Sequence, residues 1–328
     1  MTAKLEGEIL RVLADGKFHA AEEIAALLGV GRSSVLHALS EQAALRLPVF
    51  RVRGRGYRLA HGYDVLSSDT IQKMLAGSLF AAHVEVISHL ESTNAYLMQK
   101  AIAGAPHGSS VFAEFQSHGR GRRGRSWEMG WGEGLAFSLL WRFEQGAAGL
   151  SGLSLAVGVA LVRGLENFGA SGIELKWPND LIYSGGKLGG ILIELHGDAD
   201  GPCAAVIGIG INICRPREVG QPVADLRDVG FDGVDRNALA TVLLLALEST
   251  LQVFSQSGFA ALQEEWLRHH AYNDRTLCLV SGTGSVEGRF AGLAEDGALL
   301  LETKQGRQRF TVGDVSLRAE PSRDGLVE

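Results

Sequence analysis

The hydrophobic positions of the first sixty residues follow a helical period and then an extended one. Apolar residues recur at helical spacing over residues 5–13, and again on both sides of Gly29-Val30-Gly31. This pattern predicts three short helices, the last two joined as a helix-turn-helix. In "PVFRVRGRGYRLA", residues 48–60, apolar and basic positions alternate around Gly54 and Gly56. That alternation predicts a hairpin with a basic tip, the wing of a winged helix.

The pattern becomes mixed between about residue 67 and residue 272. Several strand patterns alternate with long helical ones, so we expect a mixed α/β domain with a central sheet covered by helices. The expected strands are residues 83–90, 109–116, 135–141, 172–178, 188–195 and 204–213. The expected helices are residues 92–104, 153–169 and 236–258.

The C-terminal residues change pattern again. Short alternating runs are broken by Gly, Asp-Gly and Gln-Gly, which is typical of a small β-barrel. We therefore expect a winged helix-turn-helix domain over residues 1–64, the mixed domain over 65–271 and a small barrel over 272–328.

Charge is unevenly distributed along the 328 residues. The formal net charge is −6, yet residues 1–62 contain nine Lys and Arg against six Asp and Glu. A basic winged helix favours DNA binding, and a packing module with a solvated basic face is the alternative. The candidate DNA contacts on the third helix and the wing are Arg32, Ser33, Ser34, His37, Arg53 and Arg55.

Composition narrows the class of protein. The 46% of hydrophobic and 21% of charged residues are ordinary globular values. Three cysteines without C-x-x-C spacing indicate neither a disulfide framework nor a zinc site. No segment resembles a signal peptide, and the longest apolar runs are too short to span a bilayer. We expect a cytoplasmic protein without a membrane partner.

Four arginines are concentrated in "QSHGRGRRGRSW", residues 116–127, and are separated by glycines. Glycine allows positive φ and close approach to a ligand, and guanidinium groups suit phosphate or carboxylate oxygens. A site for a small-molecule phosphate is the first hypothesis. A nucleic-acid arm and a solvated loop are the alternatives, although the cluster lies inside the mixed domain and follows an apolar strand.

A second polar patch lies in "ELKWPNDLIYSGGKLGGILIEL", residues 174–195. Reactions of anions need a cation near the developing charge and often an oxygen ligand for Mg²⁺, and Lys187 and Asp180 are of the right types. Asp180 is alternatively a simple turn residue. No G-x-x-x-x-G-K-[ST] motif occurs, so a P-loop is excluded.

Five segments together resemble the motifs of biotin–protein ligases in order and spacing. They are "ESTN" (91–94), "GRGRRGRSW" (119–127), "KWPNDL" (176–181), "GKLGGILIE" (186–194) and "GIGINI" (208–213). With its basic N-terminal region, the whole chain resembles the bifunctional members that also repress a biotin operon. The resemblance implies an SH3-like C-terminal barrel, the substrates biotin and ATP, and Mg²⁺. It also implies biotinyl-5′-AMP as intermediate and a lysine of the biotin carboxyl carrier protein of acetyl-CoA carboxylase as acceptor.

The resemblance also implies roles for individual residues. Lys187, Arg122 and Arg120 are the catalytic candidates, with Lys187 stabilising the transition state. The biotin-binding candidates are Ser92, Thr93, Asn94, Gln116, Gly119, Arg120, Arg122, Lys187, Gly190 and Ile191, and Gly189 is also expected beside biotin. The nucleotide-binding candidates are Arg123, Arg125, Trp127, Lys176, Asn179 and Asn212. Asp180 is the metal candidate, and operator DNA and a ligand-bound homodimer are the other expected partners.

Some positions depart from the family pattern. Gly134 stands where an Asn is expected, and Gly31 and His37 replace a Ser and a Lys in the DNA-binding part. Two other functions remain open from the residues alone. One is a lipoate–protein ligase, which shares the architecture and which the arginine-rich loop disfavours. The other is a ligand-sensing transcription factor without ligase activity, against which Lys187, Arg122 and Asp180 argue.

Overall fold

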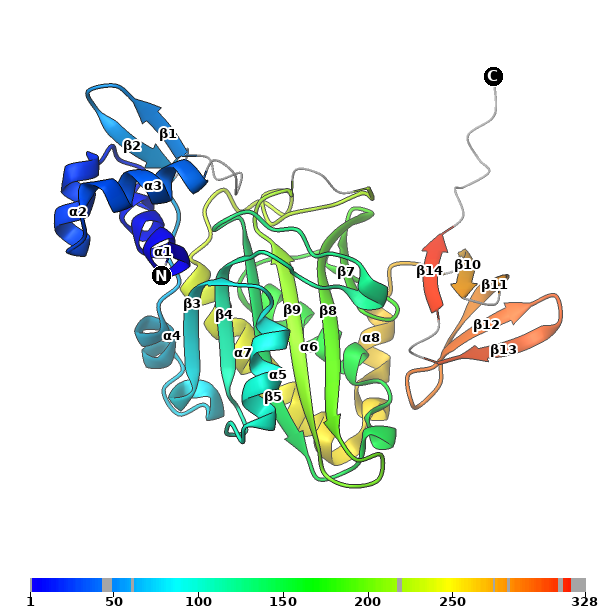
Figure 1. Cartoon of the computed structure of the whole chain (residues 1–328). Coiled ribbons are helices and arrows are strands. Elements are labelled where there is room, and N and C mark those ends of the chain that lie inside the picture. Colours follow the sequence, from blue (N-terminus) through cyan, green and yellow to red (C-terminus); the bar gives the residue numbers. More distant parts are fainter. Residues whose placement is uncertain are drawn as a thin grey trace, which may run out of the picture.

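The N-terminal unit consists of three helices and a hairpin, as the sequence predicts. The computed structural model describes residues 2–42, 49–59, 62–216, 220–273, 275–281, 284–311 and 315–319. The helices are α1 (Thr2–Leu13), α2 (Ala21–Leu28) and α3 (Arg32–Gln42), and the hairpin pairs β1 (Val49–Val52) with β2 (Gly56–Leu59). Ile9, Leu13, Ile24 and Val35 form its core, and Figure 1 shows the unit beside one edge of the central sheet.

The central sheet has seven strands in the order β3-β4-β5-β9-β8-β7-β6. β3 pairs with β4 in parallel and every other pair is antiparallel, so the sheet is mixed. Its strands are β3 (Val84–Leu90), β4 (Ser110–Gln116), β5 (Gly134–Phe143), β6 (Glu174–Lys176), β7 (Asp180–Tyr183), β8 (Gly186–Gly197) and β9 (Cys203–Asn212).

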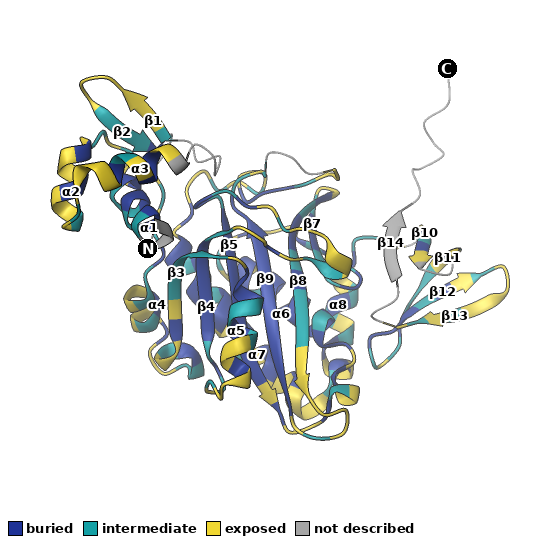
Figure 2. Cartoon of the chain, viewed as in Figure 1, coloured by how far each residue is buried: buried dark blue, intermediate teal, exposed yellow. Residues whose placement is uncertain are grey.

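Helices cover both faces of this sheet (Figure 1). α5 (Thr93–Ile102) packs on one face, where Leu97 meets Leu140 and Val206. α6 (Leu153–Asn167) and α7 (Arg236–Ser257) cover the opposite face, and residues of β9 are buried throughout (Figure 2). α7 alone among the described helices has the length and hydropathy of a membrane span, but 56% of that window is buried, as in core helices of soluble proteins.

Three short elements were not expected from the sequence. α4 (Ser68–Met74) and α8 (Gln263–Arg268) are too short for a clear helical period. Of the expected strand 172–178, only β6 forms, and the polar turn that follows it leads into β7. The prediction missed β7 because four residues after a turn carry little alternation.

The C-terminal unit is an antiparallel sheet of five strands, in the order β13-β12-β11-β10-β14. The strands are β10 (Thr276–Ser281), β11 (Gly284–Leu293), β12 (Leu299–Thr303), β13 (Gly306–Phe310) and β14 (Val315–Ala319). The unit contacts the central one where Trp177 Nε1 donates to the carbonyl of Gly297 at 3.0 Å. Residues 320–328 lie outside the described residues, so the predicted barrel is described only as this sheet.

A buried ion pair lies where the chain enters the central unit. Arg236 Nη1 lies 2.5 Å from Glu114 Oε2, and both side chains are almost fully buried. The second oxygen of Glu114 accepts from the backbone N–H of Leu66 at 2.7 Å. Close by, Trp131 joins the core of the N-terminal unit and stacks on Phe115 of β4. Arg236 Nη1 also donates to the carbonyl of Asp64 at 3.2 Å, so the two units share packing and a polar contact.

Candidate functional site

A cavity of about 290 Å³ lies above the central sheet, beside the N-terminus of α5 and beneath the arginine loop, residues 119–127. Every predicted catalytic, biotin-binding, nucleotide-binding and metal residue except Gly119 and Gly189 lines it. These are Ser92, Thr93, Asn94, Gln116, Arg120, Arg122, Arg123, Arg125, Trp127, Lys176, Asn179, Asp180, Lys187, Gly190, Ile191 and Asn212. Residues from five strands, from helix α5 and from the loops between them thus meet in one place.

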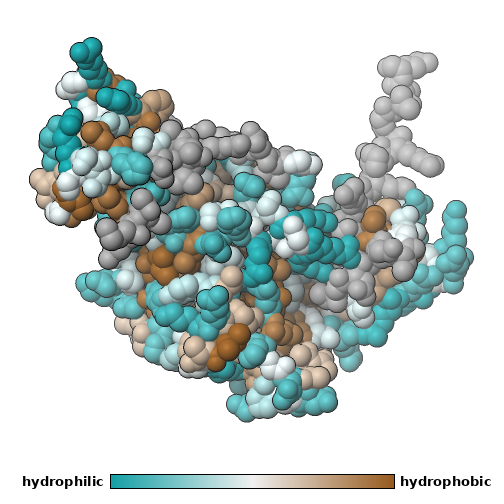
Figure 3. Space-filling view, in the orientation of Figure 1, coloured by the Kyte–Doolittle hydropathy of each residue, from teal (hydrophilic) through white to brown (hydrophobic). Residues whose placement is uncertain are grey.

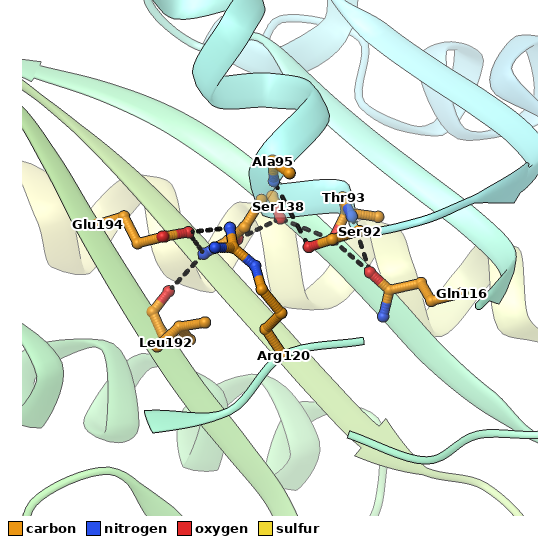
Figure 4. A network of polar contacts seen from close by, with 9 residues as sticks. Ser92, Thr93, Ala95, Gln116, Arg120, Ser138, Leu192 and Glu194 are labelled. Atoms are coloured by element: carbon orange, nitrogen blue, oxygen red, sulfur yellow. Dashed lines mark hydrogen bonds and ion pairs between the residues drawn. The ribbon is translucent and has the colours of Figure 1, made fainter. Parts of the chain in front are cut away.

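One end of the cavity is polar but largely uncharged. Ser92 caps α5, its Oγ accepting from the N–H of Ala95 at 3.4 Å. Gln116 at the end of β4 accepts at Oε1 from the N–H of Thr93 at 2.7 Å. Figure 4 shows these side chains beside Ser138, which lies on β5 at hydrogen-bonding distance from Thr93. The parallel pairing of β3 and β4 brings the chain segments that carry Ser92 and Gln116 together.

Two glycines of β9 make room for side chains at the floor of the cavity. A Cβ at Gly208 would lie 2.1 Å from Asn94 Oδ1, and one at Gly210 would lie 2.4 Å from Trp127 Cε2. Neither separation is possible for real atoms, so both positions require glycine. This explains the spacing in "GIGIN" physically: alternate residues of a strand face the same side, and here both face the site.

The arginine loop is a tight hairpin rather than an extended flexible arm. The N–H of Gly121 donates to the carbonyl of Arg125 at 2.7 Å, and that of Trp127 to Gly119 at 2.8 Å. The turn needs two left-handed residues, and these are Arg123 (φ 59°) and Gly124 (φ 71°). Of the three glycines of the loop, Gly124 has positive φ, whereas Gly119 and Gly121 do not. Gly119 is needed instead because a Cβ would lie 2.4 Å from the Trp127 carbonyl.

The arginines of this loop differ in their contacts. Arg120 Nη2 lies 2.8 Å from Glu194 Oε2, and Arg122 Nη1 donates to Asn179 Oδ1 at 3.3 Å. Burial lowers the pKa of Arg122, and the charge of Arg123 lowers it further, with partial compensation from Asp180. Arginine is not deprotonated in proteins, so the guanidinium stays charged. A half-buried cation with little compensation is suited to bind an anion.

Lys187 and Asp180 meet across two paired strands. Lys187 Nζ lies 2.6 Å from Asp180 Oδ1, and each side chain is less than 20% exposed. The register of β7 and β8 shifts between Leu181 and Ile182, which makes the intervening residue of β8 a bulge that re-aims its neighbours. Lys187 Nζ also lies 5.9 Å from the centre of the Trp127 ring. A cation, a carboxylate and an indole thus share one wall.

Three features of the site were missed by sequence reasoning. Ser138 and Glu194 extend the polar end, and Gly220, Gln221 and Val223 form a further wall. The N–H of Ala224 donates to the carbonyl of Lys187 at 3.0 Å. Asn212 Nδ2 donates to the carbonyl of Lys187 and to the carbonyl of Ala224. Both amide hydrogens of Asn212 are therefore used on backbone, and any nucleotide contact would fall to its Oδ1.

Metal binding is limited by the carboxylates at the site. Within the described residues, no group of three or more His, Cys, Asp or Glu side chains is arranged so that it could hold a metal ion. Asp180 and Glu128 are the acidic side chains that line the cavity. Mg²⁺ commonly binds through one or two carboxylates together with substrate phosphates and water, so Asp180 fits that mode and a protein-only cage does not form.

The predicted DNA contacts lie together on the N-terminal unit and are all exposed. Arg32 Nε forms an ion pair with Glu22 Oε1 at 2.5 Å. On the wing, the guanidinium of Arg55 lies 4.5 Å from the centre of the Phe18 ring. Figure 3 shows hydrophilic side chains at the tip of this hairpin. The surface is basic and accessible.

Comparisons with known proteins define the class first. Residues 86–212 match the Biotin/lipoate A/B protein ligase family, and residues 276–318 match the Biotin protein ligase C terminal domain. The fold is similar to that of a biotin protein ligase from Aquifex aeolicus in complex with biotin and ATP. That structure has 27% sequence identity and a TM-score of 0.64, and the match covers 73% of this chain and 99% of that one.

Two curated relatives narrow the assignment. The bifunctional ligase/repressor BirA of Escherichia coli is 35% identical over 95% of this chain and 97% of its own. The biotin–[acetyl-CoA-carboxylase] ligase of Paracoccus denitrificans is 32% identical over 70% of this chain and 98% of its own. The chain belongs to the biotin protein ligase family.

Proposed function

We propose that this protein is an ATP-dependent biotin–protein ligase. A carboxylate oxygen of biotin attacks the α-phosphorus of ATP, and pyrophosphate leaves to give biotinyl-5′-AMP. The amine of a carrier lysine then attacks the acyl carbon, an amide forms, and AMP leaves. The observation that carries the proposal is a single cavity lined both by the neutral polar side chains of Ser92, Thr93 and Gln116 and by several cationic side chains, Lys187 and Arg122 among them. Biotin combines a neutral ureido ring with a carboxylate, and ATP brings the phosphates.

The residues at the cationic end would act mainly through charge. Lys187 and Arg122 are suited to bind the α-phosphate and the carboxylate, where negative charge develops. Arg120 is the third catalytic candidate. Asp180 would help to hold Mg²⁺, which neutralises ATP phosphates when it is bound. Since adenylyl transfer needs little covalent help, fixed positions and charges supply most of the acceleration.

The remaining assignments follow the shape of the cavity. Ser92, Thr93 and Gln116 would bind the ureido ring, with Gly190 and Ile191 beside the biotin chain. Trp127 is suited to pack on adenine, because its ring faces the cavity above Gly210. The remaining candidates for nucleotide contact are Arg123, Arg125, Lys176, Asn179 and Asn212. Closure of the arginine loop would seal the reactive anhydride from water.

We also propose that the N-terminal unit, residues 1–64, is a winged helix-turn-helix that binds operator DNA as part of a ligand-bound homodimer. Two observations support this. The unit presents its basic residues on one accessible hairpin and helix, and the match to the bifunctional relative extends over 95% of the chain, which is too much to omit this unit. Paired half-sites on DNA suit a two-fold dimer. The central and C-terminal domains would span residues 65–271 and 272–328, the latter SH3-like, in a cytoplasmic protein.

The reaction can be tested with purified protein, biotin and ATP. We expect biotinyl-5′-AMP to accumulate, and to be consumed when a biotin carboxyl carrier protein is added, with one carrier lysine modified. Lipoate is the parallel substrate. Formation of a lipoyl adenylate alone would make the protein a lipoate–protein ligase, and biotin binding without adenylate would make it a sensor. A gel shift with and without biotin and ATP tests the repressor half.

A further inference from the structure

Glu194 on β8 contacts two parts of the site that are far apart in the sequence, the start of α5 and the arginine loop. Its Oε2 accepts from Asn94 Nδ2 at 2.9 Å, at the start of α5, and from Arg120 Nη2 at 2.8 Å, in the arginine loop. Figure 4 shows Glu194 and Arg120 facing each other above the polar side chains of the cavity. One carboxylate oxygen therefore holds both the loop and the buried amide.

The buried amide has a defined orientation. Asn94 Nδ2 faces the carbonyl of Leu192 at 3.1 Å as well as Glu194, and both of these partners only accept hydrogen bonds. Asn94 Oδ1 must then face Ser138 Oγ, which lies 2.6 Å away and is fully buried. Ser138 therefore donates its single hydroxyl hydrogen to Asn94.

The direction of the hydrogen bond from Ser138 also determines how Thr93, in the wall of the cavity, can bond. Thr93 Oγ1 lies 2.8 Å from Ser138 Oγ. Gln116 Oε1 also lies 3.1 Å from Thr93 Oγ1 and can only accept. Because the Ser138 hydrogen is already used, the single Thr93 hydrogen is donated to Ser138 or to Gln116, and its lone pairs are left to accept from a ligand. Ser92 Oγ accepts from the N–H of Ala95, so its own hydrogen is free to be donated. The cavity thus offers a donor beside an acceptor.

We propose that Glu194 is a positioning and specificity-determining residue, which fixes the hydrogen-bond polarity of the ureido site and holds the arginine loop over it. This inference rests on the proposed function. A ureido group has a carbonyl that accepts and N–H groups that donate, so it matches the donor of Ser92 and the acceptor of Thr93. A dithiolane ring offers neither. Because one oxygen serves both Asn94 and Arg120, loss of the carboxylate should loosen the loop and weaken ureido binding together.

The test compares Glu194→Gln with Glu85→Gln. Glu85 is a suitable control because it also accepts two hydrogen bonds, from Tyr96 and Lys100, on the exterior of the sheet. The first measurement is the rate of trypsin cleavage within residues 120–125 of ligand-free protein. The second is the Kd for biotin alone by calorimetry, with folding checked by circular dichroism.

We expect Glu194→Gln to be cleaved about tenfold faster and to bind biotin about tenfold more weakly, as for loss of a hydrogen bond to a charged group. Glu85→Gln should stay within about twofold of wild type in both. In an Arg120→Gln background, Glu194→Gln should accelerate cleavage no further. If Glu194→Gln does not fold, Glu194→Asp, which keeps the charge, is expected to give smaller changes of the same sign.

Each contrary result has a distinct meaning. An unchanged cleavage rate would overturn the holding of the loop by Glu194, and an unchanged Kd would overturn its control of the ureido site. Additive effects in the double variant would show that Arg120 and Glu194 act separately. If wild-type protein did not bind biotin, both the proposed function and the role of Glu194 in specificity would be refuted. The cleavage rates would still test whether Glu194 holds the arginine loop.

Discussion

Lys187 Nζ lies 2.6 Å from Asp180 Oδ1 in the wall of the cavity. The carboxylate compensates the lysine charge and fixes the ammonium group beside Trp127 and Gly190. The protein itself therefore holds the cation in a defined position, which is the main requirement for electrostatic catalysis.

Arg122 is expected to retain the adenylate. Replacing Arg122 by Ala removes a half-buried guanidinium that contacts Asn179, so biotinyl-5′-AMP should escape about tenfold faster and label bystander lysines. The measurement is biotin incorporation into a protein that is not a carrier. Arg289→Ala, at an exposed position of the C-terminal sheet, serves as control. Equal incorporation by Arg122→Ala and wild type would contradict the sealing role.

Gly210 is expected to control nucleotide binding through Trp127. A Cβ at this position would lie 2.4 Å from the indole, so Gly210→Ala should displace the ring and weaken ATP binding by about tenfold, or about 1.4 kcal/mol. Biotin affinity should change much less. Gly233→Ala is the matched control, because no atom lies within 4 Å of its Cβ. Unchanged ATP affinity in Gly210→Ala, measured by calorimetry, would argue against Trp127 at the adenine site.

The buried pair of Arg236 and Glu114 is expected to be critical for stability. Arg236→Met leaves the Glu114 charge buried without its cation, and such changes cost about 3–5 kcal/mol of unfolding free energy. Arg215→Met breaks a pair with Asp228 in which the arginine is 56% exposed, and should cost less than about 1 kcal/mol. Urea unfolding compares the two variants. Similar losses in both would mean that burial of the Arg236 pair does not matter.

His270 is expected to make the fold sensitive to acid. Burial lowers its pKa from 6.5 to about 4, with the Leu175 carbonyl opposing the shift, so the folded state keeps the imidazole neutral. The unfolded chain binds a proton below its pKa of 6.5, and stability falls as pH drops from 6.5 towards 4. The loss is at most about 3 kcal/mol.

The variant His270→Phe should remove this part of the acid sensitivity. Unfolding in urea at pH 7 and pH 4.5 measures it as a difference from wild type, and exposed His196→Gln is the control. If wild type and His270→Phe lose equal stability between the two pH values, the buried imidazole does not contribute.

The sequence predicted the elements that carry strong periodic patterns. α6 and α7 are long and apolar, and β9 is a continuous apolar strand, so local pattern alone located them. The motif residues could be assigned to one site because the resemblance grouped them. Without it, nothing in the pattern brings Arg120 near Glu194, which lies 74 residues away in the chain.

The missed residues have a common physical cause. Ser138 is a single polar residue in an apolar strand, where alternation would assign it to either face. Its role depends on Asn94, 44 residues away, and therefore on how α5 packs across β5. Pro222 and Ala224 pair with Lys187 by backbone hydrogen bonds, which leave no side-chain signature. Contacts that depend on the order of the strands in the sheet cannot be predicted from the local sequence pattern.

Biotin-dependent exchange of pyrophosphate into ATP tests the central claim most directly. Wild-type protein should catalyse exchange with biotin and not with lipoate. Lys187→Gln should lower the rate by about 10²-fold or more, as for loss of one oxyanion donor, while its Kd for biotin changes by less than about threefold. Absence of exchange with biotin in wild type would contradict the ligase assignment. Equal loss of rate and of biotin affinity in Lys187→Gln would contradict the role of Lys187 in the transition state.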